Sequence, residues 1–174
     1  ETDEGEYINK MPGKLGGDRP TLSLHREEID LIKAVGPANP KSAVVLIGGG
    51  TIIVDDWEND VSAILFAFYP GMEGGNAIAR TLTGLVNPGG KLPFVIPAKE
   101  SDLPPFDAFA EEVTYDYYHG YTLLDKKEIA PSYHFGHGLS YTRFNLSGAQ
   151  FEASSPGVTA RCKITNTGDR RGDE

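Results

Sequence analysis

The stretch from Ala63 to Pro97 constrains the fold of this chain more than any other. It opens with Ala63–Tyr69, an unbroken apolar and aromatic run that is too short for a substantial helix. Such a run is typical of a strand buried on both faces of a parallel sheet. A Pro-Gly pair ends the run, residues 76–85 carry apolar side chains at helical spacing, and residues 91–96 predict a further strand. The order strand, helix, strand indicates an α/β fold with a mostly parallel sheet between helices.

Two more segments upstream fit this architecture. We expect a helix within Ser23–Val35, with Ser23 as its N-cap and Gly36-Pro37 as its end. The β-branched run Ser42–Ile47 predicts a buried strand, and Gly48–Gly50 follows it.

The segments downstream have a different pattern. Residues 145–151 and 158–166 alternate apolar and polar side chains around turn residues, which predicts an antiparallel pair with one solvated face. Tyr115–Tyr121 contains four tyrosines in seven residues. We interpret it as a strand with aromatic packing, and the alternative is an aromatic surface that faces a sugar.

Composition excludes several classes of protein. The formal net charge of −9 and the pI near 4.9 argue against nucleic-acid and anionic-membrane partners, which select basic surfaces. No apolar run approaches the ~20 residues that span a bilayer. The single cysteine, Cys162, excludes a disulfide within the chain and a metal cage built from cysteines. Its alternating context predicts a small buried side chain.

Three motifs carry a resemblance to a known family. They are Tyr-Pro-Gly-Met-Glu-Gly-Gly-Asn-Ala-Ile-Ala at 69–79, Val-Asn-Pro-Gly-Gly-Lys-Leu-Pro at 86–93 and His-Phe-Gly-His-Gly-Leu-Ser-Tyr-Thr-Arg-Phe at 134–144. In their order and spacing they resemble the C-terminal sheet domain of family-3 glycoside hydrolases.

The resemblance implies a domain organisation. Residues 1–143 would be the family's C-terminal α/β domain, incomplete at its N-terminal side, and 144–174 the first strands of a fibronectin-III-like β-sandwich. We expect the chain to be an internal piece of a larger protein, whose partner is an N-terminal barrel domain of the same protein. A homodimer through the 99–114 loop stays open. The family would place the protein in the periplasm or outside the cell, and a cytoplasmic location also stays open.

The resemblance also implies the chemistry. Family-3 enzymes are retaining glycosidases, in which an aspartate nucleophile from the barrel domain works with a glutamate acid/base from the sheet domain. Nothing in this chain resembles the nucleophile motif. The acid/base segment corresponds to residues 3–8, where Glu6 has the family-like neighbours Gly5 and Tyr7, and Glu4 is the alternative. From the residues alone, an exposed acidic loop is the favoured interpretation of this segment, and the resemblance reverses that order.

Other candidate sites are weaker. Gly48–Gly50 and the glycines at 71–75 match no phosphate-binding motif, so we expect no cofactor. His134 and His137 lie in a turn motif, and with His119 they lack an obvious ligand pattern, so we expect no metal site. Glu73 precedes a predicted helix, where a carboxylate has a structural role.

Three functions remain open at this level. The favoured one is part of an exo-acting, β-glucosidase-like enzyme whose substrate is a β-glucoside or related oligosaccharide. The alternatives are a non-catalytic α/β domain that binds carbohydrate or serves as a scaffold, and a flavodoxin-like nucleotide-binding domain.

Overall fold

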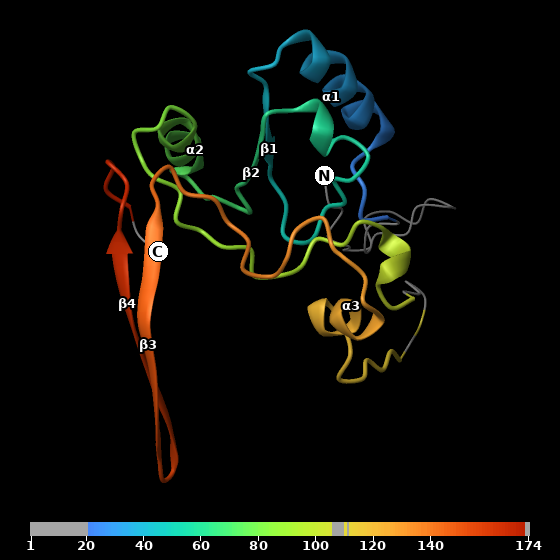
Figure 1. Cartoon of the computed structure of the whole chain (residues 1–174). Coiled ribbons are helices and arrows are strands. Elements are labelled where there is room, and N and C mark those ends of the chain that lie inside the picture. Colours follow the sequence, from blue (N-terminus) through green and yellow to red (C-terminus); the bar gives the residue numbers. More distant parts are fainter. Residues whose placement is uncertain (1–20, 106–109, 111, 173–174) are drawn as a thin grey trace. The chain divides into compact units, whose positions relative to one another are not determined.

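The computed structural model of the chain describes residues 21–105, 110 and 112–172 (Figure 1). They form two compact units: the first contains the described residues up to Gly75 together with Leu92–His137, and the second contains Asn76–Lys91 and the described residues from Gly138 on. The elements, in order, are α1 (Arg26–Ala38), β1 (Ala43–Leu46), the 3₁₀ turn η1 (Glu58–Asp60), β2 (Ala63–Phe66), α2 (Gly74–Leu82), the 3₁₀ turn η2 (Glu100–Asp102), α3 (Tyr121–Lys127), β3 (Phe144–Ser154) and β4 (Gly157–Asn166).

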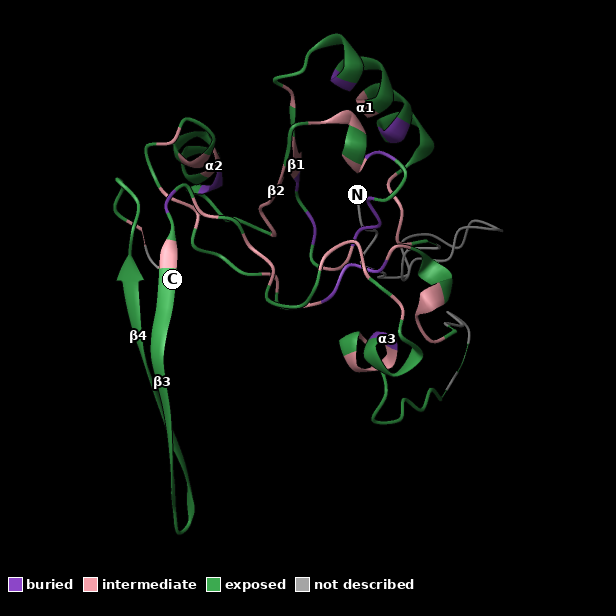
Figure 2. Cartoon of the chain, in the orientation of Figure 1, coloured by how far each residue is buried: buried purple, intermediate pink, exposed green. Residues whose placement is uncertain are grey.

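The first unit is built on a small parallel sheet. Strands β1 and β2 pair in parallel from Ala43 opposite Ala63 to Leu46 opposite Phe66. The buried core beside them, purple in Figure 2, combines one helical residue with strand and loop residues: Ile29, Leu46, Ile52, Val54, Trp57 and Ile96. The fold is therefore α/β, as the sequence predicts.

Strand β2 is less buried than the apolar run predicts. Ala63 is exposed and the rest of β2 is half-buried, whereas the sequence predicts burial on both faces. The parallel sheet has two strands in the described residues, so each strand has a neighbour on one side only.

Helix α1 differs from its prediction at both ends. It begins at Arg26, with His25 rather than Ser23 as the N-cap. The Glu28 carboxylate accepts a hydrogen bond of 3.0 Å from the His25 backbone N–H. At the other end the helix continues through Gly36 and Pro37, because the Asn39 backbone N–H still bonds to the last turn. Gly36 is buried against the Asp60 backbone, where any Cβ would clash.

The strand predicted at 91–96 is not a member of the parallel sheet. This segment instead pairs with Tyr133–His137, which overlaps the Phe-Gly-x-Gly motif: Leu92 N donates to His137 O (2.8 Å), and Ile96 exchanges both backbone bonds with Tyr133. Pro93 and Pro97 have no N–H to donate, so the segment cannot sustain a regular ladder.

The strand predicted at Tyr115–Tyr121 is also wrong. This segment forms a turn that leads into α3. Asp116 and Thr122 side chains bond to nearby backbone groups, and such local bonds compete with strand pairing.

In the second unit, two motif segments distant in sequence bond to each other. The Asn87 side-chain oxygen accepts hydrogen bonds from Ser140 Oγ (3.1 Å) and the Tyr141 backbone N–H (2.7 Å). The Tyr141 hydroxyl donates to Thr81 O at the end of α2 (3.0 Å). The Asn-Pro-Gly-Gly and Gly-Leu-Ser-Tyr motifs are therefore joined by an asparagine side chain.

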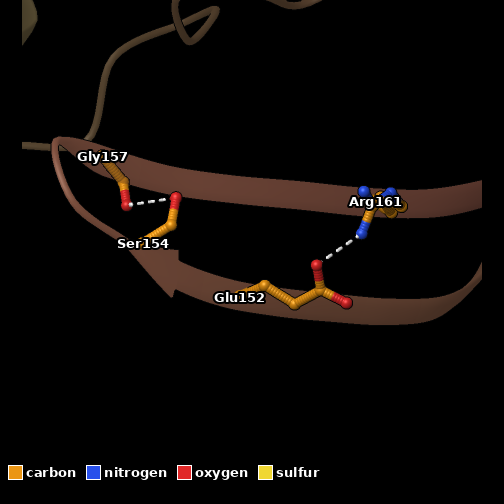
Figure 3. Close-up of polar contacts among 4 residues, drawn as sticks. All are labelled: Glu152, Ser154, Gly157 and Arg161. Atoms are coloured by element: carbon orange, nitrogen blue, oxygen red, sulfur yellow. Dashed lines mark hydrogen bonds and ion pairs between the residues drawn. The ribbon is translucent and has the colours of Figure 1, made fainter.

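Strands β3 and β4 form the predicted antiparallel hairpin. The polar face carries an ion pair of 2.8 Å between Arg161 and Glu152, and Ser154 bonds to Gly157 near the turn (Figure 3). Because both charged side chains are exposed, this ion pair contributes little stability.

The other face of the hairpin is apolar and also exposed. Leu146 lies opposite Ile164, and Phe151 lies opposite Ala160. Cys162 lies on the same face as Ala160 and Ile164 and is exposed, so its predicted burial is wrong. No other part of the described chain covers this face. That β3, which begins at Phe144, opens a second domain of β-sandwich type stays a prediction.

The core predicts the effect of one substitution in β1. Leu46→Ala removes a buried side chain, and we expect the free energy of unfolding of the first unit to fall by about 2–5 kcal/mol. Hydrogen exchange of the β1 and β2 amides as a function of urea, in the complete gene product, measures this change. Met72→Ala is the control, because Met72 is fully exposed and its removal leaves no cavity. Equal exchange in the two variants would contradict the core described here.

The phenol of Tyr133 predicts how the stability of the folded state depends on pH. Burial, and then the hydrogen bond and negative charge of Glu58, raise the pKa of its phenol from 10.0 to about 12. The folded state therefore prefers the protonated phenol, so this contribution to stability is complete below pH 10 and is lost as the pH rises from 10 to about 12. We expect Tyr133→Phe to remove this part of the pH dependence of unfolding. A difference absorbance titration of the two proteins would show a phenol that ionises near pH 10 if the assignment is wrong.

Candidate functional site

The carboxyl ends of β1 and β2 define a candidate site edge in the first unit. Gly48–Gly50 follows β1, and the segment Phe68–Gly71 follows β2. Because the strands are parallel, both segments leave the sheet at the same edge, which is where ligands of open α/β sheets bind.

Phe68 gives this edge its local geometry. Its φ of 53° lies in the left-handed region, which costs energy for a residue with a Cβ. Ring contacts with Phe66 (centroids 4.6 Å apart) and Phe94 (5.9 Å) hold it there. The chain then turns to bring Tyr69 over Gly49, where a Cβ would lie 2.7 Å from the tyrosine ring. Any side chain at position 49 would therefore have to displace the Tyr69 ring.

A second segment, Thr21–Ser23, is attached beside the core. The Glu100 carboxylate accepts hydrogen bonds from Thr21 Oγ1 (2.7 Å) and the Leu22 backbone N–H (3.3 Å). On its other side, Leu22 O accepts a bond of 2.9 Å from Ile53 N, and Ser23 forms a parallel bridge to Ile53. We call Thr21–Ser23 the N-terminal tether.

The predicted acid/base residues Glu6 and Glu4 lie outside the described residues. Along the sequence, the N-terminal tether is the first described segment that follows them. Sequence reasoning missed Glu100. Its partners Thr21 and Leu22 lie 79 and 78 residues away, and no local pattern signals such a contact.

The carboxylates in the segments that follow β1 and β2 have separate surroundings. Asp55 and Asp56 are exposed, and Glu58 bonds to Tyr133. Glu73 immediately precedes α2, which agrees with its predicted position at a helix N-terminus.

The histidines are placed by ring and backbone contacts. His119 Nδ1 lies 2.8 Å from Asp116 O, and the His137 ring contacts the Tyr133 ring with centroids 4.8 Å apart. His134 O accepts a bond from His137 N in the turn, as the motif predicts. Within the described ranges, no group of three or more potential metal ligands is assembled. None of the described helices is both long and apolar enough to cross a membrane.

The tyrosines of 115–121 are exposed rather than packed in a core. Tyr115, Tyr117, Tyr118 and Tyr121 all lie at the surface of the first unit. Of the two interpretations from sequence, the strand is wrong; the rings are exposed, and that they face a sugar stays a prediction.

The sequence of this chain is similar to a known family model and to known proteins. Residues 1–141 match the family model described as "Glycosyl hydrolase family 3 C-terminal domain". "Probable beta-glucosidase I" of Aspergillus flavus is 40% identical over 173 residues, which cover 91% of this chain and 20% of that protein. "Probable beta-glucosidase J" of Emericella nidulans is 41% identical over 146 residues, which cover 81% of this chain and 17% of that protein. The chain thus spans about a fifth of the length of these curated relatives.

Solved structures show the same relationship. The β-D-glucoside glucohydrolase of Trichoderma reesei has a TM-score of 0.84 at 28% identity, over 94% of this chain and 26% of that one. β-Glucosidase 3B of Thermotoga neapolitana, solved in complex with glucose, has a TM-score of 0.82 at 35% identity, over 91% of this chain and 24% of that one. The α/β fold and the three motifs agree with these comparisons: the chain belongs to glycosyl hydrolase family 3 and contains the C-terminal domain of that family.

Proposed function

We propose that this chain is part of a retaining, exo-acting β-glucosidase that hydrolyses O-glycosidic bonds and that it supplies the general acid/base. One observation carries the proposal: 91% of the chain matches a protein named as a β-glucosidase at 40% identity. The glucose complex of the Thermotoga neapolitana enzyme, at 35% identity, supports a glucoside as the substrate. Since the chain spans about a fifth of its relatives, the activity belongs to the complete gene product.

The chemistry divides between two carboxyl groups. The nucleophile attacks the anomeric carbon, while the acid protonates the departing oxygen and later, as a base, activates water. Glu6 is our first candidate for the acid/base and Glu4 the second, and the nucleophile would be an aspartate of a barrel domain. In retaining sites the two groups lie about 5–5.5 Å apart, so the charge of the nucleophile raises the pKa of the acid.

In this proposal, the role of the N-terminal tether is to position the segment that carries the acid/base. A general acid must lie within hydrogen-bond reach of the departing oxygen, so the segment that carries it needs a fixed attachment. Glu100 bonds to two successive residues of the tether, a hydroxyl of Thr21 and an amide of Leu22. We infer that Glu100 is a positioning residue for the acid/base segment.

Substitution of the acid has a characteristic kinetic signature. We expect Glu6→Ala in the complete gene product to lower turnover of natural β-glucosides by ~10²–10⁴-fold, because protonation of the leaving group is lost. Aryl glucosides with good leaving groups need little protonation, so their first step should change far less. Added azide should restore breakdown of the glycosyl-enzyme, because azide attacks without a general base, and should give a β-glycosyl azide. Steady-state kinetics with both substrate classes and product analysis measure these effects.

Glu4→Ala is the matched control for Glu6→Ala. If Glu4→Ala shows the kinetic signature and Glu6→Ala resembles the wild type, the acid/base is Glu4. If neither variant shows it although the wild type hydrolyses glucosides, the acid/base lies elsewhere. A wild-type protein that binds sugar without turnover would instead support the non-catalytic domain. The family assignment leaves the nucleotide-binding alternative without support.

Substitution of Glu100 tests the tether. We expect Glu100→Ala to lower turnover of substrates with poor leaving groups by ~10-fold, and to affect good leaving groups less, because the acid is then poorly aligned. Glu100→Gln retains an acceptor oxygen for Thr21 and Leu22 and should recover most of the loss. An equal loss for both substrate classes would mean that Glu100 contributes to folding alone.

A further inference from the structure

The turn that leads into α3 borders an open pocket in the first unit. The pocket has a volume of about 390 Å³ and is lined by Leu103–Pro105, Thr114–Asp116, Tyr118, Leu123 and Lys127. We call it the tyrosine pocket. All of its lining residues belong to the Leu92–His137 part of the first unit.

Short-range polar contacts hold the turn beside the tyrosine pocket. Asp116 Oδ1 accepts a hydrogen bond of 2.7 Å from the Tyr118 backbone N–H. Thr122 Oγ1 accepts one of 3.2 Å from His119 N and lies 2.8 Å from His119 O, to which it donates. His119 Nδ1–H donates to Asp116 O at 2.8 Å. The turn is therefore shaped by hydrogen bonds and does not need the tyrosine rings to be buried.

The tyrosine rings differ in what they offer to a ligand. Lys126 Nζ lies 3.7 Å from the centroid of Tyr118, so a cation covers one face of that ring. Tyr117 is 76% exposed and packs edge-on against Tyr118, but it does not line the pocket. Tyr115 lines the pocket and is 51% exposed. Among the described tyrosines, Tyr115 is thus the best placed to stack on a ligand.

The polar groups of the lining narrow the class of ligand. Asp116 and Lys127 contribute one charge of each sign, which suits a neutral molecule better than an anion or a cation. Thr114 adds a hydroxyl, and aromatic surface with a few polar groups is typical of a small-molecule site. A pyranose ring matches this lining, because it has one face of C–H groups and a rim of hydroxyls.

We propose that the tyrosine pocket binds a pyranose unit of the carbohydrate substrate, with Tyr115 stacked on the sugar and Asp116 and Lys127 bonded to its hydroxyls. This inference rests on the proposed function for the identity of the sugar. It makes the tyrosine pocket a determinant of substrate binding, and it assigns no part of the bond cleavage to these residues.

Binding measurements on matched variants test the inference. The complete gene product is titrated calorimetrically with a thio-linked cellobiose analogue, which resists hydrolysis. We expect Tyr115→Ala to weaken binding by about 10-fold, the upper range for one aromatic contact. Tyr115→Phe keeps the ring and should bind within about twofold of the wild type, as should Tyr117→Ala, which removes an exposed ring outside the pocket. Unchanged binding by Tyr115→Ala would overturn the inference.

A chemical probe shows whether the tyrosine pocket is open. Nitration by tetranitromethane, followed by peptide mass spectrometry, should modify Tyr115 in the free protein, and the thio-linked cellobiose should protect it. If Tyr115 of the free protein resists nitration, another part of the gene product covers the pocket, and the inference is overturned. Hydrolysis of an aryl β-glucoside is measured in parallel. Sugar binding that depends on Tyr115 without any hydrolysis would contradict the proposed function and leave this inference standing.

Discussion

The first unit depends on the antiparallel pairing of two segments distant in sequence, Leu92–Ile96 and Tyr133–His137. Backbone bonds join Leu92 to His137 and Gly136, and join Ile96 to Tyr133 in both directions. These bonds bring together the two ends of the stretch that runs from Ile96 to Tyr133, so η2, the tyrosine pocket and α3 belong to one closed loop. The same pairing places Ile96 in the core and Tyr133 against it, where its hydroxyl reaches Glu58. Sites on this loop thereby gain a rigid base.

Part of this fold follows from the sequence alone. β1, β2, α2 and the β3–β4 hairpin lie close to their predicted positions, because each has a period or run that few other structures satisfy. The wrong strand at 91–96 shows the limit of that reasoning. Its apolar pattern is correct for an extended buried segment. Its pairing is decided by Pro93, which has no N–H to donate, and by His137, whose backbone oxygen accepts a hydrogen bond from Leu92. His137 lies 45 residues from Leu92 in the sequence (137 − 92 = 45). Pairing of this kind has no local signal.

The candidate functional site, like the fold, follows from the sequence only in part. The tyrosine-rich segment is conspicuous in the sequence, yet only the bonds of Asp116 and Thr122 show that it is a turn with exposed rings. Glu100 was missed altogether, since a glutamate in a turn near Pro97 resembles any solvated carboxylate until Thr21 and Leu22 are seen to bond to it. The acid/base candidates Glu6 and Glu4 depend on the family motif, because a charged loop has no periodicity to interpret.

The two parts of the proposed site differ in how firmly the chain can hold them. The turn that borders the tyrosine pocket is shaped by bonds that span five residues or fewer, so the conformation of that turn follows from its own residues. Residues 7–20 separate Glu6 from Thr21, and an extended chain of that length reaches roughly 50 Å. Attachment at Thr21 therefore cannot alone fix the carboxyl of Glu6 to the fraction of an ångström that proton transfer needs. For this reason the effect of Glu100 on catalysis is expected to be graded, whereas that of the acid itself is expected to be large.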